Sequence, residues 1–301
     1  MKTIYFAAGC FWGAEHFFSG VDGVSAVTTG FANGDTPDPT YKEVYTDTTG
    51  YAETVRIDYN PSLVDLRTLT ELLFTIIDPL SVNRQGEDEG SRYRTGVYYT
   101  DEAEFPVVKA VFDEVALRLG RPLAVELEPL RCFFPAEEYH QHYLDKNPGG
   151  YCHIPLKTFR YLRLYQDLRN LLAGEDDIIA RMANTAALIH ERMHFWWTGF
   201  YIVRGEELVL GPFQGPVACY RIRRGRGVCG TAWAEKRCVV VPDVEEFPGH
   251  IACSAASKSE IVVPLRSAGG EVTSVLDIDS AELATFDDTD ALWLGKITEL
   301  L

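Results

Sequence analysis

The chain has 301 residues, 46% of them hydrophobic, which is enough for two ordinary domains that each bury a core. Its 44 acidic residues outnumber its 28 lysines and arginines, and the net charge of -16 disfavours nucleic acid and anionic membrane surfaces as partners. The sequence has no apolar run of about 20 residues and no long apolar core of a signal peptide near its start. We therefore expect a cytoplasmic protein that does not enter a membrane.

The first half of the chain mixes strand and helix patterns. In chain order they predict a strand over 3–7, a helix over 11–18, a strand over 52–59, a helix over 66–77, a strand over 94–100, a helix over 104–119 and a strand over 123–127. This order predicts an α+β domain, a sheet with packed helices. The segment 145–157 is rich in glycine and proline and cannot continue a helix. It predicts a boundary between domains at 1–157 and 158–301.

The second half opens with two helical patterns, over 159–174 and 175–193, and the second starts with acidic residues suited to a helix N-terminus. Short β-rich runs separated by glycine-rich turns follow, over 200–204, 207–211, 238–243, 260–266 and 272–279. A helix over 287–301 ends the chain. This pattern predicts a second α+β domain, an antiparallel sheet flanked by helices.

Seven cysteines lie at positions 10, 132, 152, 219, 229, 238 and 253. Their number is odd, none forms a C-x-x-C pair, and no Cys/His spacing suits zinc. We expect neither a disulfide scaffold nor a metal site, and no cofactor. In a reducing compartment each thiol is then either a small buried hydrophobe or a nucleophile.

Cys10 stands between Gly9, which ends a predicted strand, and a helix that begins near Phe11. The unpaired amides of a helix N-terminus stabilise a thiolate, so this placement predicts a lowered thiol pKa. By itself the arrangement also fits a cysteine packed in a core.

The five residues from Gly9 to Gly13 read GCFWG, which resembles the active-site signature of the peptide methionine-(S)-sulfoxide reductases. The resemblance continues through the segments 39–41, 50–53, 85–88, 93–94, 140–141, 146–148 and 150–152, and so covers nearly all of residues 1–157. It implies an MsrA-like domain, a mixed-sheet α/β sandwich, with Cys10 as the nucleophile that becomes a sulfenic acid.

A sulfoxide oxygen leaves only once it is protonated, so the reaction needs an acid beside the thiol. The resemblance gives this role to Glu53, provided that an apolar setting raises its pKa. The substrate-binding residues that it implies are two hydroxyls that hold the sulfoxide oxygen, a neighbouring carboxylate, and an apolar cup for the substrate methyl group: Tyr41 and Tyr93, Asp88, and Phe11 with Trp12.

Cys152, in a glycine-rich loop, is the resolving thiol that the resemblance implies, and thioredoxin is the implied reductant. Cys132 fits a buried hydrophobe better. Two positions depart from the family pattern: Tyr51 and Glu89 stand where histidine is frequent. Either change could alter the pKa of Glu53 or the substrate preference.

From Trp197 onward the chain is similar to the free methionine-(R)-sulfoxide reductases, a catalytic branch of the GAF fold. The resemblance rests on the segments 197–201, 208–219, 224–232, 241–264 and 275–280. Three cysteines match the thiols of that branch and lie 10 and then 24 residues apart, at 219, 229 and 253. The resemblance implies Cys253 as nucleophile, Cys219 as resolving thiol and Cys229 as an auxiliary partner, whereas Cys238 fits core packing.

A pocket selective for free methionine sulfoxide must match its ammonium and carboxylate groups. The resemblance implies three site carboxylates, Glu260, Asp277 and Asp279, and two aromatic walls, Trp197 and Tyr201. Without the resemblance, the two aspartates equally fit the polar face of an alternating strand. The arginines between 221 and 226 fit a solvated loop. A homodimer through the GAF-like domain is a further expectation.

The leading interpretation is a bifunctional repair enzyme for oxidative stress: the N-terminal domain reduces the S epimer, protein-bound or free, and the C-terminal domain reduces the free R epimer. The main alternative keeps the N-terminal reductase but makes the GAF domain a non-catalytic methionine sensor. A third interpretation is a redox sensor in which oxidation of Cys10 signals to the second domain.

Overall fold

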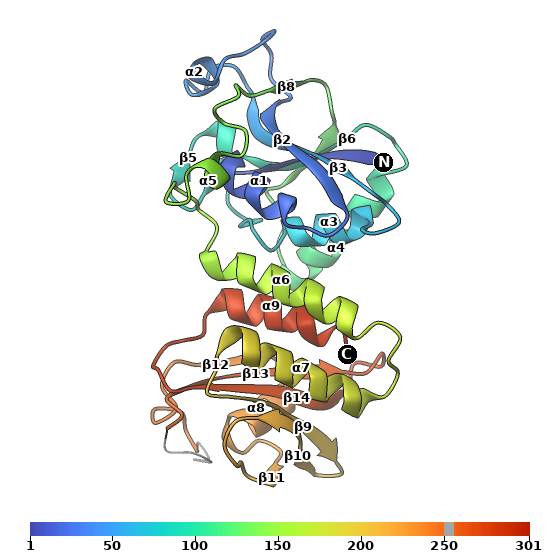
Figure 1. Ribbon diagram of the computed structural model, residues 1–301, viewed down its shortest axis with the longest axis vertical. Helices are drawn as coiled ribbons and strands as arrows, with labels where there is room; N and C mark the ends of the chain where they lie inside the picture. The colour runs from blue at the N-terminus through green and yellow to red at the C-terminus, as the bar shows by residue number, and fades with distance from the viewer. Residues whose placement is uncertain (250–255) are drawn as a thin grey trace. The chain divides into compact units, whose positions relative to one another are not determined.

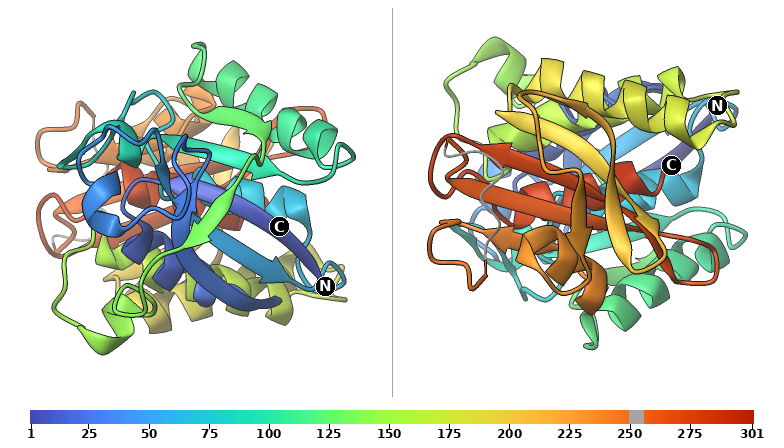
Figure 2. Two further views of the ribbon diagram at one scale, coloured as in Figure 1. Left: turned by 90° about the horizontal axis from the view of Figure 1, so that it is seen from above. Right: turned by 90° about the horizontal axis from the view of Figure 1, so that it is seen from below.

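The structure is a computed structural model that describes residues 1–249 and 256–301. The chain divides into two compact units, Met1–Phe159 and Arg160–Leu301. Each unit holds its own six-stranded sheet, and both can be followed in Figure 1 and Figure 2. None of the helices in the described ranges is both long and apolar enough to cross a bilayer.

The N-terminal sheet has the order β7-β6-β1-β3-β2-β8. Its strands are β1 (Lys2–Ala8), β2 (Val24–Ala32), β3 (Ala52–Tyr59), β6 (Thr95–Tyr99), β7 (Glu126–Pro129) and β8 (Phe133–Pro135). Only β6 and β7 pair in parallel, and the remaining neighbours are antiparallel. The predicted mixed sheet is therefore confirmed. A separate ribbon joins β4 (Arg84–Gln85) to β5 (Asp88–Glu89).

The helical elements of this unit are α1 (Phe11–Ser19), α2 (Tyr41–Val44), α3 (Leu66–Leu73), η1 (Ser91–Tyr93), α4 (Phe105–Leu119) and α5 (Tyr143–Lys146). Helix α1 packs on β1, β2 and β3, while α3 packs against α4 (Figure 1). Side chains fix their starts: Asp65 accepts a hydrogen bond from the Thr68 amide at 2.7 Å, and Thr40 and Glu43 form a capping box. At the other end, Gly120 closes α4 with a φ of 64°.

Three sequence predictions needed adjustment here. The helix expected over 66–77 ends at Leu73, because the next amides turn tightly and bond three residues back, as Thr75 does to Leu72. The strand expected over 123–127 lies at Glu126–Pro129. Strand β2 was not predicted, since its Ser- and Thr-rich sequence and a bulge near its start obscure the alternation of a strand.

The C-terminal sheet has the order β11-β10-β9-β14-β13-β12 and is antiparallel throughout, as predicted. Its strands are β9 (Trp197–Arg204), β10 (Glu207–Gln214), β11 (Arg221–Arg223), β12 (Val239–Val241), β13 (Ser259–Arg266) and β14 (Val272–Ser280). The helices are α6 (Leu156–Leu171), α7 (Ile178–Met193), α8 (Gly227–Glu235) and α9 (Asp288–Thr298). In Figure 1, α7 and α9 lie on one side of the sheet and α8 on the other.

Acidic caps start two of these helices. The Asp177 carboxylate accepts hydrogen bonds from the amides of Ile179 and Ala180, both at 2.9 Å, so the expected acidic start of α7 is confirmed. Asp287 and Asp290 form a capping box at the start of α9. Between the sheet and α8 lies a core of apolar residues that includes Leu208, Val262 and Val275, and this core supports one wall of a pocket described below.

Candidate functional sites

Cys10 is the N-cap residue of α1 and is only 5% exposed. Gly9 makes this position possible: its φ is 77°, and a Cβ there would lie 2.6 Å from Cβ of Gln85. Burial raises the pKa of the Cys10 thiol well above its usual value, and the charge of Glu53 raises it further. A hydrogen bond from the Trp12 amide opposes this shift but does not outweigh it. The expectation of a lowered thiol pKa is therefore wrong, because desolvation exceeds the effect of the helix N-terminus.

Glu53 lies on β3 and is 1% exposed. Its Oε2 accepts a hydrogen bond of 3.0 Å from the amide of Phe11, the residue that follows Cys10. Burial raises the pKa of Glu53 to about 8, although the Phe11 amide and the Arg92 guanidinium act in the opposite direction. The apolar setting that the sequence analysis required for this acid is therefore present, and at neutral pH the carboxyl group carries a proton that it can donate.

The two predicted hydroxyls belong to the same cluster. Burial raises the pKa values of Tyr41 and Tyr93, and the charges of Glu53 and Cys10 raise both further. The pKa of Asp88 is raised by burial as well, and its Oδ2 accepts a hydrogen bond of 3.0 Å from the Tyr151 hydroxyl. The structure therefore brings the predicted thiol, acid, hydroxyls and neighbouring carboxylate together from the start of α1 and from β3, α2, η1 and β5.

Trp12 is half-buried and stacks on Tyr143, with ring centroids 3.8 Å apart. Its indole N–H donates to Nδ1 of His140 at 3.1 Å. Phe11, in contrast, is only 1% exposed. Its ring packs in the core, with its centroid 5.8 Å from that of Phe31. Of the predicted apolar cup, Trp12 therefore offers accessible surface, whereas Phe11 supports the site from the core.

Cys152 is half-buried and free, on the loop after α5. Its sulfur lies against the first turn of α1, since a Cβ built on Gly13 would be 3.0 Å from Sγ of Cys152 and 3.1 Å from Cδ1 of Ile154. Cys152 also contributes to the raised pKa of the Cys10 thiol. The glycine at position 13 thus allows the loop that carries Cys152 to approach the start of the helix.

We expect Gly13→Ala to slow formation of the disulfide between Cys10 and Cys152, because the added methyl group would push Cys152 and Ile154 away from α1. Alanine otherwise favours a helix over glycine by about 1 kcal/mol, so loss of folding is not the expected cause. The measurement is the rate of thiol loss after one equivalent of methionine sulfoxide, with a sulfenic acid trap as a second readout. The matched control is Gly149→Ala on the same loop, where a Cβ meets no atom within 4 Å. Equal rates for the two variants would contradict this reading of the contact.

Three further residues of this site were not predicted. Arg92 is 7% exposed, forms an ion pair with Asp47 and lies over the ring of Tyr93 at 4.4 Å. His140 is 2% exposed and accepts the bond from Trp12. Burial lowers the pKa of His153 to about 4, and its Nδ1 lies 4.0 Å from Oδ2 of Asp88. His140 lies within a segment of the family resemblance, and Arg92 and His153 are adjacent to such segments, so proximity to these segments was the available signal.

Tyr51 and Glu89, the two residues that depart from the family pattern, each contact another residue of the N-terminal unit. The Tyr51 hydroxyl donates to the carbonyl of Thr36, and Cys132 Sγ lies 3.9 Å from the same hydroxyl. Cys132 itself is half-buried and free. Glu89 is exposed and lies 3.5 Å from Arg84.

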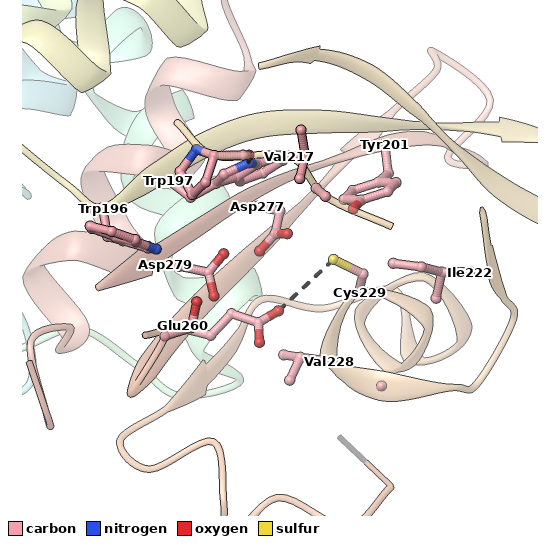
Figure 3. Close-up of a pocket in the computed structure, with 14 residues that line it drawn as sticks. Trp196, Trp197, Tyr201, Val217, Ile222, Val228, Cys229, Glu260, Asp277 and Asp279 are labelled. Carbon is pink, nitrogen blue, oxygen red and sulfur yellow. Dashed lines mark hydrogen bonds between the residues drawn. The ribbon is translucent and has the colours of Figure 1, made fainter. Parts of the chain in front are cut away.

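The second site is a pocket of the C-terminal unit, shown in Figure 3. Strand register assembles its polar wall, because Glu260 on β13 pairs with Asp279 on β14, and Asp277 projects from the same face two residues earlier. Trp197 and Tyr201 on β9 line the same pocket. Two acidic side chains directly opposite each other on paired strands, such as Glu260 and Asp279, destabilise a sheet. Their presence here therefore indicates a functional site.

Glu260 and Asp277 are buried, and Asp279 is half-buried. Burial raises the pKa of Glu260 and of Asp277 well above the usual value, and the neighbouring carboxylates add to both shifts. The pKa of Asp279 is raised to about 6, mainly by burial. Among the described residues that line the pocket there is no lysine, arginine or histidine. Within the described part of the chain, the pocket therefore presents acidic groups without a cationic side chain in its lining.

The cysteines of this unit have separate environments. Cys229 lies in the first turn of α8, is 3% exposed and free, and its sulfur is 3.9 Å from Oε1 of Glu260. Cys219 is disulfide-bonded, and its carbonyl accepts a bond of 3.1 Å from Tyr201. The predicted nucleophile, Cys253, lies outside the described residues. Cys238 is half-buried and free, and it is not among the described residues that line this pocket.

The arginine cluster between 221 and 226 is exposed and contributes no residue to the pocket. Arg221 forms an ion pair of 3.1 Å with Glu207, and Arg224 lies over the Trp233 ring at 5.5 Å. The expected exposure of this cluster is confirmed, but Arg221 and Arg223 lie on β11 and not in a loop, because this segment pairs with β10.

The folds and sites together define an oxidoreductase with a buried thiol and a buried acid in its N-terminal unit, joined to a GAF domain. Residues 2–170 match the family model of the peptide methionine sulfoxide reductases, and residues 173–301 match a GAF domain model. The chain belongs to the peptide methionine sulfoxide reductase family, and it is a methionine sulfoxide reductase.

Individual relatives match one half each. A peptide methionine sulfoxide reductase MsrA of Lachnoclostridium phytofermentans is 54% identical over 153 residues, 51% of this chain and 92% of that protein. GAF domain-containing protein A of Dictyostelium discoideum is 53% identical over 146 residues, 48% of this chain and 92% of that protein. A solved structure of free methionine-R-sulfoxide reductase from Neisseria meningitidis, in complex with its substrate, is 52% identical with a TM-score of 0.46, and the match covers 46% of this chain and 84% of the other.

Proposed function

We propose that the N-terminal domain reduces the S epimer of methionine sulfoxide, protein-bound or free, with Cys10 as nucleophile and Glu53 as acid. The observation that carries this proposal is the buried carboxyl group of Glu53, which accepts a hydrogen bond from the amide next to Cys10 and whose pKa is raised by burial. The sulfur of Cys10 takes the oxygen from the sulfoxide, so an S–O bond breaks in the substrate and one forms on Cys10. Glu53 gives its proton to that oxygen and receives the thiol proton in return.

The products of this step are methionine and the sulfenic acid of Cys10. The thiol of Cys152 then displaces water from the sulfenic acid and forms a disulfide with Cys10. A dithiol of the thioredoxin type reopens that disulfide. The contact of Cys152 with the first turn of α1 supports this order, since it brings the second thiol to the helix that Cys10 caps.

For the C-terminal domain we propose reduction of the free R epimer by Cys253, with Cys219 as the resolving thiol and Cys229 as an auxiliary partner. The supporting observation is a pocket whose acidic wall fits a free ammonium group, flanked by aromatic residues. A peptide-bound residue has no such ammonium group. Disulfide bonding of Cys219 supports a redox role for that cysteine.

The test is a chiral assay of the intact chain with thioredoxin and its reductase, on free and peptide-bound methionine sulfoxide. We expect consumption of free S, peptide-bound S and free R sulfoxide, while peptide-bound R sulfoxide persists. If free R sulfoxide also persists while methionine binds to the protein, the GAF domain is the non-catalytic sensor of the alternative interpretation. Consumption of peptide-bound R sulfoxide would contradict the assignment of the acidic pocket to free amino acids.

A further inference from the structure

Arg92 places a positive charge inside the N-terminal site. It is 7% exposed and lies on η1, one position before Tyr93. Its guanidinium forms an ion pair with Asp47, which follows α2, and its Nη1 donates a hydrogen bond of 3.3 Å to the carbonyl of Tyr45. A buried charge is costly unless it is paired and hydrogen-bonded. These contacts therefore allow the protein to keep an arginine at this depth.

The carboxylate of Asp47 joins two segments that are 45 residues apart in the chain. Besides pairing with the guanidinium, its Oδ1 accepts hydrogen bonds from the Arg92 amide at 3.0 Å and from the Ser91 hydroxyl at 3.1 Å. Gly90 leaves room for this ion pair, since a Cβ there would lie 2.5 Å from Oδ2 of Asp47 and 2.8 Å from Nη1 of Arg92. One carboxylate thus fixes the start of η1 to the segment after α2.

The guanidinium of Arg92 also lies over two tyrosine rings. Its Cζ is 4.2 Å from the ring centroid of Tyr45 and 4.4 Å from that of Tyr93. The ring of Tyr45 in turn lies 5.9 Å from that of Tyr41. A cation over an aromatic face is attracted by the ring. Arg92 therefore connects the segments that carry the two hydroxyls proposed to hold the sulfoxide oxygen, those of Tyr41 and Tyr93.

The charge of Arg92 acts on the acid of the site as well. Burial raises the pKa of Glu53, and the guanidinium opposes this shift, whereas the charges of Asp88 and Asp47 add to it. The guanidinium opposes the effect of burial in the same way at Tyr41, Asp88 and Tyr93. The charged and titratable groups that interact with Glu53 are Cys10, Tyr41, Asp47, Asp88, Arg92 and Tyr93. Arg92 is the cation of this group.

We propose that Arg92 is a positioning residue of the sulfoxide reaction. It holds Tyr41 and Tyr93 at a fixed spacing, and it stabilises the carboxylate of Glu53 once the proton has passed to the sulfoxide oxygen. The second role follows from charge, since a cation in a site of low dielectric constant favours the ionised form of a nearby acid. The first follows from shape, since a planar guanidinium can stack on rings while it pairs with a carboxylate, and a lysine ammonium cannot. The inference rests on the function proposed for the N-terminal domain.

The test is single-turnover formation of methionine from peptide-bound S sulfoxide by the reduced, intact chain. It is followed across the pH range around 8, to which burial raises the pKa of Glu53. Arg92→Gln removes the cation that opposes protonation of Glu53, so the decline in rate with rising pH should move to higher pH. The rate at neutral pH should fall by about tenfold or more, because the hydroxyls lose their fixed spacing.

Asp47→Asn should have the opposite effect on the pH profile. It removes a negative charge that raises the pKa of Glu53, after burial the main cause, and it keeps an oxygen that accepts from the Arg92 amide. The decline should therefore move to lower pH. Opposite shifts in the two variants are a result that loss of packing does not produce.

Two further variants separate charge from shape. Arg92→Lys should keep the decline near its position in the unmodified protein but should not restore the full rate. The matched control is Arg56→Gln, because Arg56 is an exposed arginine of β3 that pairs with Asp58 at 3.1 Å. It should keep both the rate and the pH profile. Thermal unfolding followed by circular dichroism checks the fold of each variant, and if Arg92→Gln does not fold, the shift in Asp47→Asn decides the question.

An unshifted decline in Arg92→Gln would overturn the inference, as would a shift that Arg92→Lys does not reverse. An unshifted decline in Asp47→Asn, or one that moves to higher pH, would overturn it too. An unmodified chain that forms no methionine from the S sulfoxide would instead contradict the proposed function itself.

Discussion

Replacing Cys10 by serine is expected to abolish reduction of the S epimer, by more than about a thousandfold, and to leave reduction of the free R epimer unchanged. A serine hydroxyl cannot take the sulfoxide oxygen in the way that a thiol does, so no sulfenic acid can form. The reciprocal variant, Cys253→Ser, should abolish reduction of free R sulfoxide and leave the S activity intact. The two variants together separate the two proposed sites on one chain.

The measurement is consumption of each purified epimer by the intact chain with a chemical dithiol as reductant, so that docking of thioredoxin does not affect the result. Cys238→Ser is the matched control, because Cys238 is a free, half-buried cysteine of the C-terminal unit without a proposed role. It should keep both activities. If Cys10→Ser retained the S activity, the nucleophile would have to be another thiol. If Cys253→Ser retained the R activity, the role of Cys253 would be wrong and the N-terminal assignment would stand.

Replacing Glu53 by glutamine is expected to lower the rate of S-sulfoxide reduction by about 10²–10⁴-fold, the usual contribution of a positioned acid. The amide is isosteric, and its oxygen can still accept the bond from the Phe11 amide, so the helix start should keep its geometry. The variant lacks only the proton that the sulfoxide oxygen needs.

The pH profile provides the sharper readout. Because burial raises the pKa of Glu53 to about 8, the carboxyl group is protonated below that pH and loses its proton above it. The activity that depends on this acid should therefore fall as pH rises through about 8 in the unmodified protein. In Glu53→Gln the residual rate should lack this decline, since the amide does not titrate in this range.

Glu15→Gln is a suitable control for that experiment. Glu15 is also a buried carboxylate, on α1, where burial raises its pKa, and it accepts a bond of 2.9 Å from the His142 amide. It should therefore report the general effect of neutralising a buried carboxylate in this unit. A decline near pH 8 that persists in Glu53→Gln and disappears in Glu15→Gln would assign the acid to Glu15 instead.

Some of the chemistry was accessible from short motifs. A glycine before Cys10 and a helix after it depend on local sequence, because a left-handed glycine and helical periodicity are properties of adjacent residues. Both sheets were predicted in type from the order of their elements. Strand β2 was missed because its burial comes from its neighbours in the sheet rather than from an alternating pattern of its own.

The amino-acid sequence by itself indicated the candidate thiols and acids of both sites, the longer helices and the two-part organisation of the chain. Only the tertiary structure decided the pKa shifts of those groups and which of them lie next to one another. Burial reversed the expected shift of the Cys10 pKa, and the pairing of β13 with β14 brought Glu260 beside the two aspartates. The physical reason is that desolvation and charge–charge interactions depend on distances in space, which join residues far apart in the chain.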